Sequence, residues 1–124
     1  MKQDLKNNKI PEYSTTDIEN ILNSIYNEIA DRDMNPVENS YTNYLLNEGT
    51  NKICKKIGEE ATETVIAALS EGKDELVGEI SDLTYHILVL MYNKQITLED
   101  VKLKLEERFE IKGNKKQFNK RGNY

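Results

Sequence analysis

Two short acidic motifs are the part of this sequence best suited to chemistry. The first is Glu59-Glu60-x-x-Glu63 and the second is Glu79-x-x-Asp82. Residues three apart in an α-helix lie one turn apart on the same side, so Glu60 and Glu63 project together, as do Glu79 and Asp82. If the two segments form an antiparallel helical hairpin, these four carboxylates meet at one level.

Four carboxylates at a partly buried seam repel one another and raise one another's pKa values unless a cation lies among them. With one Cys and one His in the chain, no Cys/His zinc set is available. Ligands that are only oxygens favour Mg²⁺ or Mn²⁺, and Mg²⁺ also takes phosphate oxygens of substrates. We therefore expect Glu60, Glu63, Glu79 and Asp82 to bind such a metal. The alternative is a solvated acidic face, the usual place for Glu on helices.

Basic residues next to the acidic motifs indicate a phosphorylated ligand. Lys52, Lys56 and Glu60 follow one another along one flank of the same segment, which suits a polyphosphate shared between metal and ammonium groups. The alternative is a surface ion pair between Lys56 and Glu60, worth only about 0.3–0.5 kcal/mol. His86 lies four residues after Asp82 on the same flank, so it could orient a carboxylate, contact substrate or be structural.

Helices at five places in the chain must position these residues. Apolar residues recur there at helical spacing, and the expected helices cover about residues 16–31, 41–48, 50–70, 74–93 and 97–109. Gly49 follows the second helix, where a positive φ is favourable, and Thr97 with Asp100 has the spacing of a capping box. Since no segment alternates apolar and polar residues at period two, we expect an all-α bundle of about five helices.

The apolar pattern also predicts a homodimer. The third and fourth helices carry apolar stripes, expected to be Ile53, Ile57, Ala61, Val65 and Ala68, and Leu76, Ile80, Leu83, Ile87 and Leu90. Apolar residues outside the main stripes are Leu45, Leu46, Leu88 and Val89. The fourth helix is apolar nearly all round at residues 87–91, and such a helix is expected to be enclosed on every side. A second copy of the chain would complete the bundle.

Length and charge limit the other possibilities. The 124 residues fit one domain, and the 22 acidic against 17 basic side chains argue against a nucleic-acid partner. No apolar run is long enough for a membrane span or a signal peptide, so we expect a cytoplasmic protein. We expect a flexible segment at 1–15, the helical domain at 16–110, and a disordered tail at 111–124, which has five basic residues and no acidic one.

Three motifs together resemble the phosphoribosyl-ATP pyrophosphohydrolase family of histidine biosynthesis, over roughly residues 17–109. They are Ser40-Tyr41-Thr42, the run from Lys55 to Glu63 (KKIGEEATE), and the run from Glu79 to His86 (EISDLTYH). The acidic pattern is shared with the wider group of MazG-like all-α nucleotide pyrophosphohydrolases. The combination with the other two motifs is similar to the histidine-pathway member in particular.

The resemblance implies hydrolysis of phosphoribosyl-ATP to phosphoribosyl-AMP and pyrophosphate, with Mg²⁺, in a homodimer. It makes Glu60, Glu63, Glu79 and Asp82 the metal ligands, and Glu59 the carboxylate that orients or deprotonates water. The residues expected to bind substrate are Lys52, Lys56, Tyr41, Thr42, Tyr85 and His86.

Other functions remain open at this point. One alternative is a house-cleaning pyrophosphohydrolase acting on noncanonical nucleoside triphosphates, and another is a helical interaction module with no active site. In many organisms the family enzyme is fused to a cyclohydrolase that binds zinc through Cys and His. One Cys and one His exclude that domain from these residues, so we expect the chain as given to be monofunctional.

Overall fold

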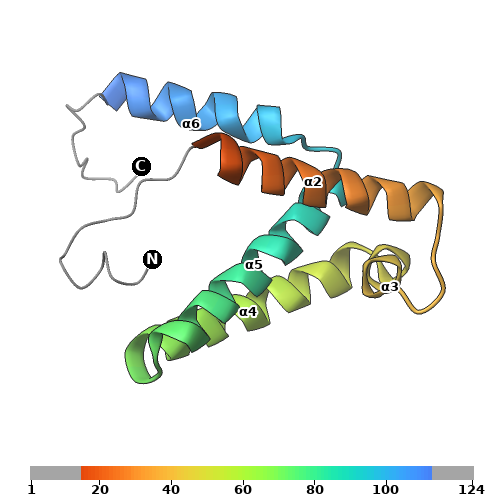
Figure 1. The fold of residues 1–124 in the computed structure, drawn as a ribbon, viewed down its shortest axis with the longest axis horizontal. Helices are drawn as coiled ribbons and strands as arrows, with labels where there is room; N and C mark the ends of the chain where they lie inside the picture. The colour runs from red at the N-terminus through yellow and green to blue at the C-terminus, as the bar shows by residue number, and fades with distance from the viewer. Residues whose placement is uncertain (1–14, 113–124) are drawn as a thin grey trace.

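The computed structural model describes residues 15–112, and every regular element in that part of the chain is a helix (Figure 1). The helices are α2 (Thr15–Met34), α3 (Tyr41–Glu48), α4 (Thr50–Ser70), α5 (Lys73–Asn93) and α6 (Leu98–Lys112). The predicted all-α class and the five helices are confirmed. The main differences are that α2 and α6 continue past their expected ends near residues 31 and 109, to Met34 and Lys112. The expectations for residues 1–14 and 113–124 lie outside the described residues.

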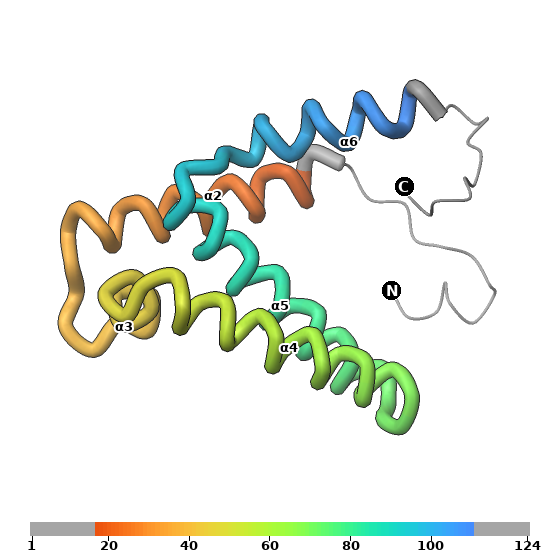
Figure 2. Tube along the Cα trace, turned by 180° about the vertical axis from the view of Figure 1, so that it is seen from behind, coloured from red at the N-terminus to blue at the C-terminus, as the bar shows by residue number. Residues whose placement is uncertain are grey.

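A long helical hairpin dominates the arrangement. In both views α4 and α5 run antiparallel along most of their length, α2 crosses the end of the hairpin away from its turn, and α6 runs alongside α2 (Figures 1 and 2). The short α3 packs where α2, α4 and α5 meet. None of the described helices has a stretch both long enough and apolar enough to cross a bilayer.

The core lies where α2, α3, α4 and α5 meet. One residue from each helix, Ile29, Leu45, Ile53 and Val89, is fully buried there. Each such side chain stabilises the fold by about 1.5–3 kcal/mol relative to an exposed position. The core therefore holds the end of the hairpin away from its turn, and α3 is fixed against it.

The predicted apolar stripes are wrong in part. Leu45, Leu88 and Val89, expected to need a second copy to cover them, are buried within the chain itself. Ile80 and Ile87, expected on the packed stripe of α5, are 46% and 40% exposed. The reason is that the second half of α5 is apolar nearly all round, so the pattern alone does not identify which flank faces α4.

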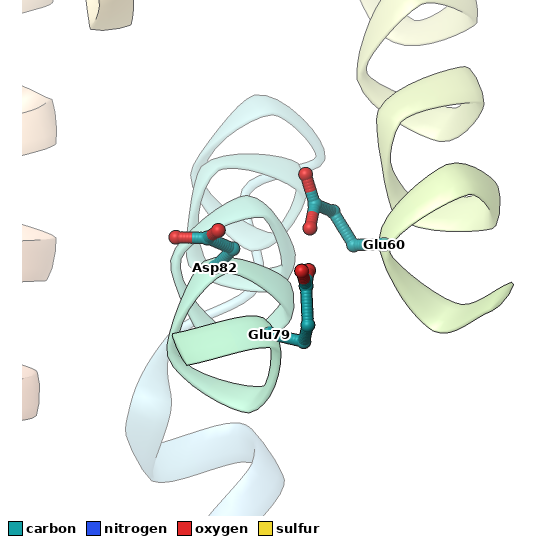
Figure 3. A group of neighbouring side chains, drawn as sticks. All are labelled: Glu60, Glu79 and Asp82. Carbon is teal, nitrogen blue, oxygen red and sulfur yellow. The ribbon is translucent and has the colours of Figure 1, made fainter. Parts of the chain in front are cut away.

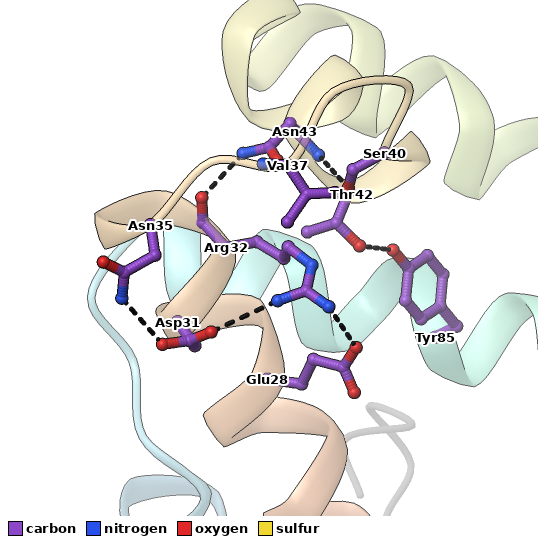
Figure 4. A network of polar contacts seen from close by, with 9 residues as sticks. All are labelled: Glu28, Asp31, Arg32, Asn35, Val37, Ser40, Thr42, Asn43 and Tyr85. Atoms are coloured by element: carbon purple, nitrogen blue, oxygen red, sulfur yellow. Dashed lines mark hydrogen bonds and ion pairs between the residues drawn. The ribbon is translucent and has the colours of Figure 1, made fainter.

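Polar contacts hold the loop between α2 and α3 (Figure 4). The Asn43 amide Nδ2 donates to the carbonyl of Arg32 at 2.7 Å, and its Oδ1 accepts from the backbone N–H of Val37 at 2.8 Å. Ser40 caps α3 through its hydroxyl, which accepts from the backbone N–H of Asn43 at 3.1 Å. These bonds fix the start of α3, and with it the Ser40-Tyr41-Thr42 motif.

Two sequence-predicted helix ends are confirmed. Thr97 and Asp100 form a reciprocal capping box, in which the Thr97 backbone N–H donates to the Asp100 carboxylate at 2.9 Å and the Asp100 N–H donates to the Thr97 hydroxyl at 3.0 Å. Gly49 ends α3 with φ +91° and ψ −172°. An L residue rarely adopts this backbone conformation, so glycine is required there.

Gly49→Ala is expected to lower the free energy of unfolding by about 1–3 kcal/mol, because a Cβ at this φ strains the backbone even though no atom lies within 4 Å of it. The matched control is Gly58→Ala in α4, where a Cβ also meets nothing within 4 Å and φ is helical. That variant is expected to raise the free energy of unfolding by about 0.5–1 kcal/mol. Urea denaturation of both variants measures the two changes, and a loss of equal size in both would contradict the argument.

Candidate active site

Three carboxylates meet between α4 and α5. Glu60 comes from α4, and Glu79 and Asp82 come from α5, with one turn of helix between them (Figure 3). One oxygen of each lies within 4.8 Å of an oxygen of the other two. The hairpin therefore brings together acidic groups from both predicted motifs.

The carboxylates lie on the flanks of α4 and α5 that pack against each other. Glu60 is in helical register with buried Ile53 and Ala67 along α4. Along α5, Glu79 and Asp82 are in register with buried His86 and Val89. The acids thus continue the buried face of each helix, with Asp82 at its exposed edge. This explains the incorrect stripe prediction, because acids interrupt the inward flank of both helices, at Glu60 between Ile53 and Ala67 on α4 and at Glu79 and Asp82 before His86 and Val89 on α5.

Two of these oxygens are buried without a hydrogen-bond partner, Oε1 of Glu60 and Oε1 of Glu79. The pKa of Glu79 is raised from 4.5 to about 7, first by burial and then by the neighbouring carboxylates of Glu63 and Glu60. Buried acceptors without donors are costly and rare in folded proteins. A hard divalent cation fits this oxygen-only set, because it would neutralise the repulsion and coordinate the unpaired oxygens.

Glu63 and Glu59 lie beside this cluster. Glu63 acts directly on the carboxyl of Glu79, as its effect on the Glu79 pKa shows, although it lies outside the group of three. Glu59 is exposed and pairs with Lys56, with 3.4 Å between Nζ and Oε1. The sequence left open a surface pair between Lys56 and Glu60. In the structure Lys56 pairs with Glu59.

The remaining predicted residues gather where α3 meets α5. The hydroxyl of Tyr41 lies 2.9 Å from Nε2 of His86, and the hydroxyls of Thr42 and Tyr85 are hydrogen-bonded to each other. The Tyr41 ring stacks with the Tyr85 ring at a centroid distance of 6.3 Å. The motif at the start of α3 is therefore attached directly to the end of the second acidic motif.

Tyr44 belongs to the same group, although it is not among the residues expected from the sequence to bind substrate. Its ring stacks on Tyr41 with centroids 5.9 Å apart, and the ammonium of Lys52 lies 5.7 Å from its centroid. The spacing of Tyr41 and Tyr44 on one helix could have indicated this, since residues three apart are neighbours on a helix surface. Lys52 is thereby placed beside the aromatic group, and Lys56 beside the carboxylates.

The chain matches a known protein family over most of its length. Residues 22–109 match the family described as phosphoribosyl-ATP pyrophosphohydrolase. The chain is 53% identical over 97 residues to the phosphoribosyl-ATP pyrophosphatase of Clostridium botulinum (strain Hall), which covers 78% of this chain and 88% of that protein.

A longer relative matches as well. The histidine biosynthesis bifunctional protein HisIE of Lactococcus lactis is 50% identical over 105 residues, covering 85% of this chain and 50% of that protein. The chain spans about half the length of the bifunctional relatives that it matches. The family match extends from within α2 to within α6 and includes both acidic motifs. On this evidence, the chain belongs to the phosphoribosyl-ATP pyrophosphohydrolase family.

Proposed function

We propose that this chain hydrolyses phosphoribosyl-ATP to phosphoribosyl-AMP and pyrophosphate and that it requires Mg²⁺. The observation that carries the proposal is the cluster of Glu60, Glu79 and Asp82, with two buried oxygens that have no hydrogen-bond donor. The family match and the printed name of the Clostridium relative support the choice of substrate.

Each group near the cluster has a role in this proposal. Glu60, Glu63, Glu79 and Asp82 hold the metal, which when bound supplies positive charge to phosphate oxygens and lowers the pKa of water. Lys52 and Lys56 bind the polyphosphate. Exposed Glu59, beside Lys56, orients or deprotonates the water that attacks the bond between the α and β phosphates. Tyr41, Thr42, Tyr85 and His86 complete the substrate site.

Pyrophosphate release tests this function against the alternatives. Purified protein is assayed with phosphoribosyl-ATP and with a panel of nucleoside triphosphates, each with Mg²⁺ and with chelator. We expect turnover of phosphoribosyl-ATP only, and only with Mg²⁺. Turnover of noncanonical triphosphates in its place would establish the house-cleaning activity, and no turnover of any compound would favour an interaction module.

A homodimer is the second part of the proposal. The residues first expected to form the interface are buried in the chain, but other apolar side chains on α4 and α5 are exposed. They include Val65, Leu69, Val77 and Ile80, with Leu69 81% exposed. Surfaces of this kind on a small protein mark an interaction site. A second copy that packs its own hairpin there would cover them through an isologous interface.

Sedimentation equilibrium at low micromolar concentration is expected to give twice the chain mass of 14.4 kDa. Leu69→Lys is expected to weaken the dimer by at least about tenfold, because it brings a charge into the proposed interface. The control is Leu103→Lys on α6, which is also exposed and outside the proposed interface. A wild-type species of 14.4 kDa with full activity would contradict the dimer.

A further inference from the structure

His86 is the one buried polar side chain among residues 17–110, with 5% of its surface exposed. Both ring nitrogens have partners inside the protein. Nδ1 lies 2.8 Å from the backbone carbonyl oxygen of Asp82, and Nε2 lies 2.9 Å from the hydroxyl of Tyr41. A ligand therefore has no free ring nitrogen to contact.

The partners determine where the protons lie. A carbonyl oxygen can only accept, so Nδ1 must carry a proton and donate it to Asp82. In a neutral imidazole Nε2 is then an acceptor, and the hydroxyl of Tyr41 donates to it. The tautomer of His86 on α5 thus fixes the direction of the Tyr41 hydroxyl on α3.

The Tyr41 hydroxyl lies near charged groups of the proposed site. With its proton directed at His86, the oxygen presents only lone pairs to its other neighbours. Burial is the largest cause that raises the pKa of the Tyr41 phenol, while the ammonium of Lys56 lowers it and the carboxylate of Glu60 raises it to a smaller extent. His86 therefore holds the Tyr41 hydroxyl within the group of residues proposed to bind substrate.

We propose that His86 is a positioning residue, which holds the Tyr41 hydroxyl in one orientation, with its lone pairs toward the substrate site. The proposal rests on the proposed function, because it assigns Tyr41 to the substrate site. It replaces direct contact between His86 and substrate with an effect through Tyr41. The stacking of Tyr41 on Tyr85 and Tyr44 supports it by fixing the ring on which the hydroxyl is carried.

The tautomer can be measured without turnover. The chain has a single His, so ¹⁵N-labelled protein gives one imidazole in a long-range ¹H–¹⁵N correlation spectrum. At about pH 8, where an imidazole is ordinarily neutral, we expect the Nδ1–H tautomer, with Nε2 shifted when Tyr41→Phe removes its donor. An Nε2–H tautomer, or an Nε2 signal unchanged by Tyr41→Phe, would overturn the proposal even if phosphoribosyl-ATP is hydrolysed.

Kinetics test the effect on substrate. His86→Asn keeps an amide donor for the Asp82 carbonyl but has no acceptor that reaches Tyr41, and Tyr41→Phe keeps the ring without the hydroxyl. Each is expected to raise KM for phosphoribosyl-ATP by about five- to tenfold with kcat within about twofold, as expected for one lost hydrogen bond. The double variant is expected to match the single variants, because both act through one contact.

The control is Tyr92→Phe, which removes another tyrosine hydroxyl from α5. That hydroxyl donates to Asp33 at 2.6 Å, away from the proposed site, and its loss is expected to change KM by less than about twofold. Equal KM changes in Tyr92→Phe and Tyr41→Phe would show that His86 has only a structural role, and would overturn the proposal. Additive effects of His86→Asn and Tyr41→Phe would also overturn the proposal. Failure of the proposed function itself is seen separately, as absence of turnover in the wild-type protein.

Discussion

Glu60→Gln, Glu79→Gln and Asp82→Asn are each expected to lower kcat for phosphoribosyl-ATP by more than about a hundredfold, the range seen when a group that stabilises developing charge is removed. Each substitution removes one negative charge from the cluster between α4 and α5 at almost constant volume. The helical fold is therefore expected to remain, as measured by circular dichroism.

The matched control is Asp74→Asn, which removes an exposed carboxylate in the first turn of the same helix α5. Its turnover is expected to stay within about twofold of wild type, with a loss of stability of about 0.3–1 kcal/mol from the helix dipole. Near-wild-type turnover of Glu60→Gln, Glu79→Gln or Asp82→Asn at limiting Mg²⁺ would show that the residue concerned is not a ligand. Loss of helicity in all three would instead mean that the cluster is needed for folding.

The metal-free protein is expected to lose stability as pH rises from about 5 to about 8, and Glu79 is the reason. Its pKa is raised from 4.5 in the unfolded chain to about 7 in the folded protein. Between these values the folded state binds more protons than the unfolded state, so the free energy of unfolding falls as pH rises. The contribution is complete below pH 4.5 and is lost as pH rises through about 7.

Thermal unfolding at the two pH values, with and without Mg²⁺, measures this effect. Because other carboxylates also titrate, the relevant quantity is the difference between wild type and Glu79→Gln, in which the Glu79 contribution is absent. Mg²⁺ is expected to stabilise the wild type more at pH 8 than at pH 5, since binding requires the ionised carboxylate. A pH dependence that is the same in wild type and Glu79→Gln would contradict the raised pKa.

Periodicity and local signals in the sequence predicted the helices well. Apolar spacing located all five, and the ends at Gly49 and Thr97 followed from the backbone preference of glycine and from the capping-box spacing. These features depend on neighbours within a few residues of the chain. They are therefore available from one sequence without knowledge of tertiary contacts.

The inward flank of the hairpin could not be predicted in the same way. On α5, Ile80 and Ile87 form as good an apolar stripe as Leu88 and Val89, and only the contact with α4 decides between them. The acids at Glu60 and Glu79 lie on the packed flank, whereas hydrophobicity alone places Glu at the border of such a flank. The carboxylates on the packed flank thus break the hydrophobic pattern on which the prediction depended.

The partners of His86 were also beyond the sequence. Its position after Asp82 gave the correct flank, but the bond to Tyr41 depends on how α3 docks between α2 and α5. That docking is fixed by Asn43 in the first turn of α3, which donates to the carbonyl of Arg32 in α2, and by Ser40, which caps α3. The contact of Tyr44 with Lys52 also depends on tertiary structure, because Lys52 is on α4, whereas the stacking of Tyr44 on Tyr41 follows from their spacing on α3.

The hairpin has a consequence for the order in which the protein folds. Glu60 and Asp82 are joined by one tight turn and by helix on either side of it, so their meeting closes only a short loop and costs little chain entropy. Contacts within the hairpin span fewer residues than contacts between α2 and α5, so we expect them to form before α2 packs across the far end of the hairpin. The charge repulsion between the acids would then oppose an early step, and a divalent cation in the folding buffer would increase the folding rate. A divalent cation bound by Glu60, Glu79 and Asp82 would in this way stabilise the hairpin during folding as well as in the folded protein.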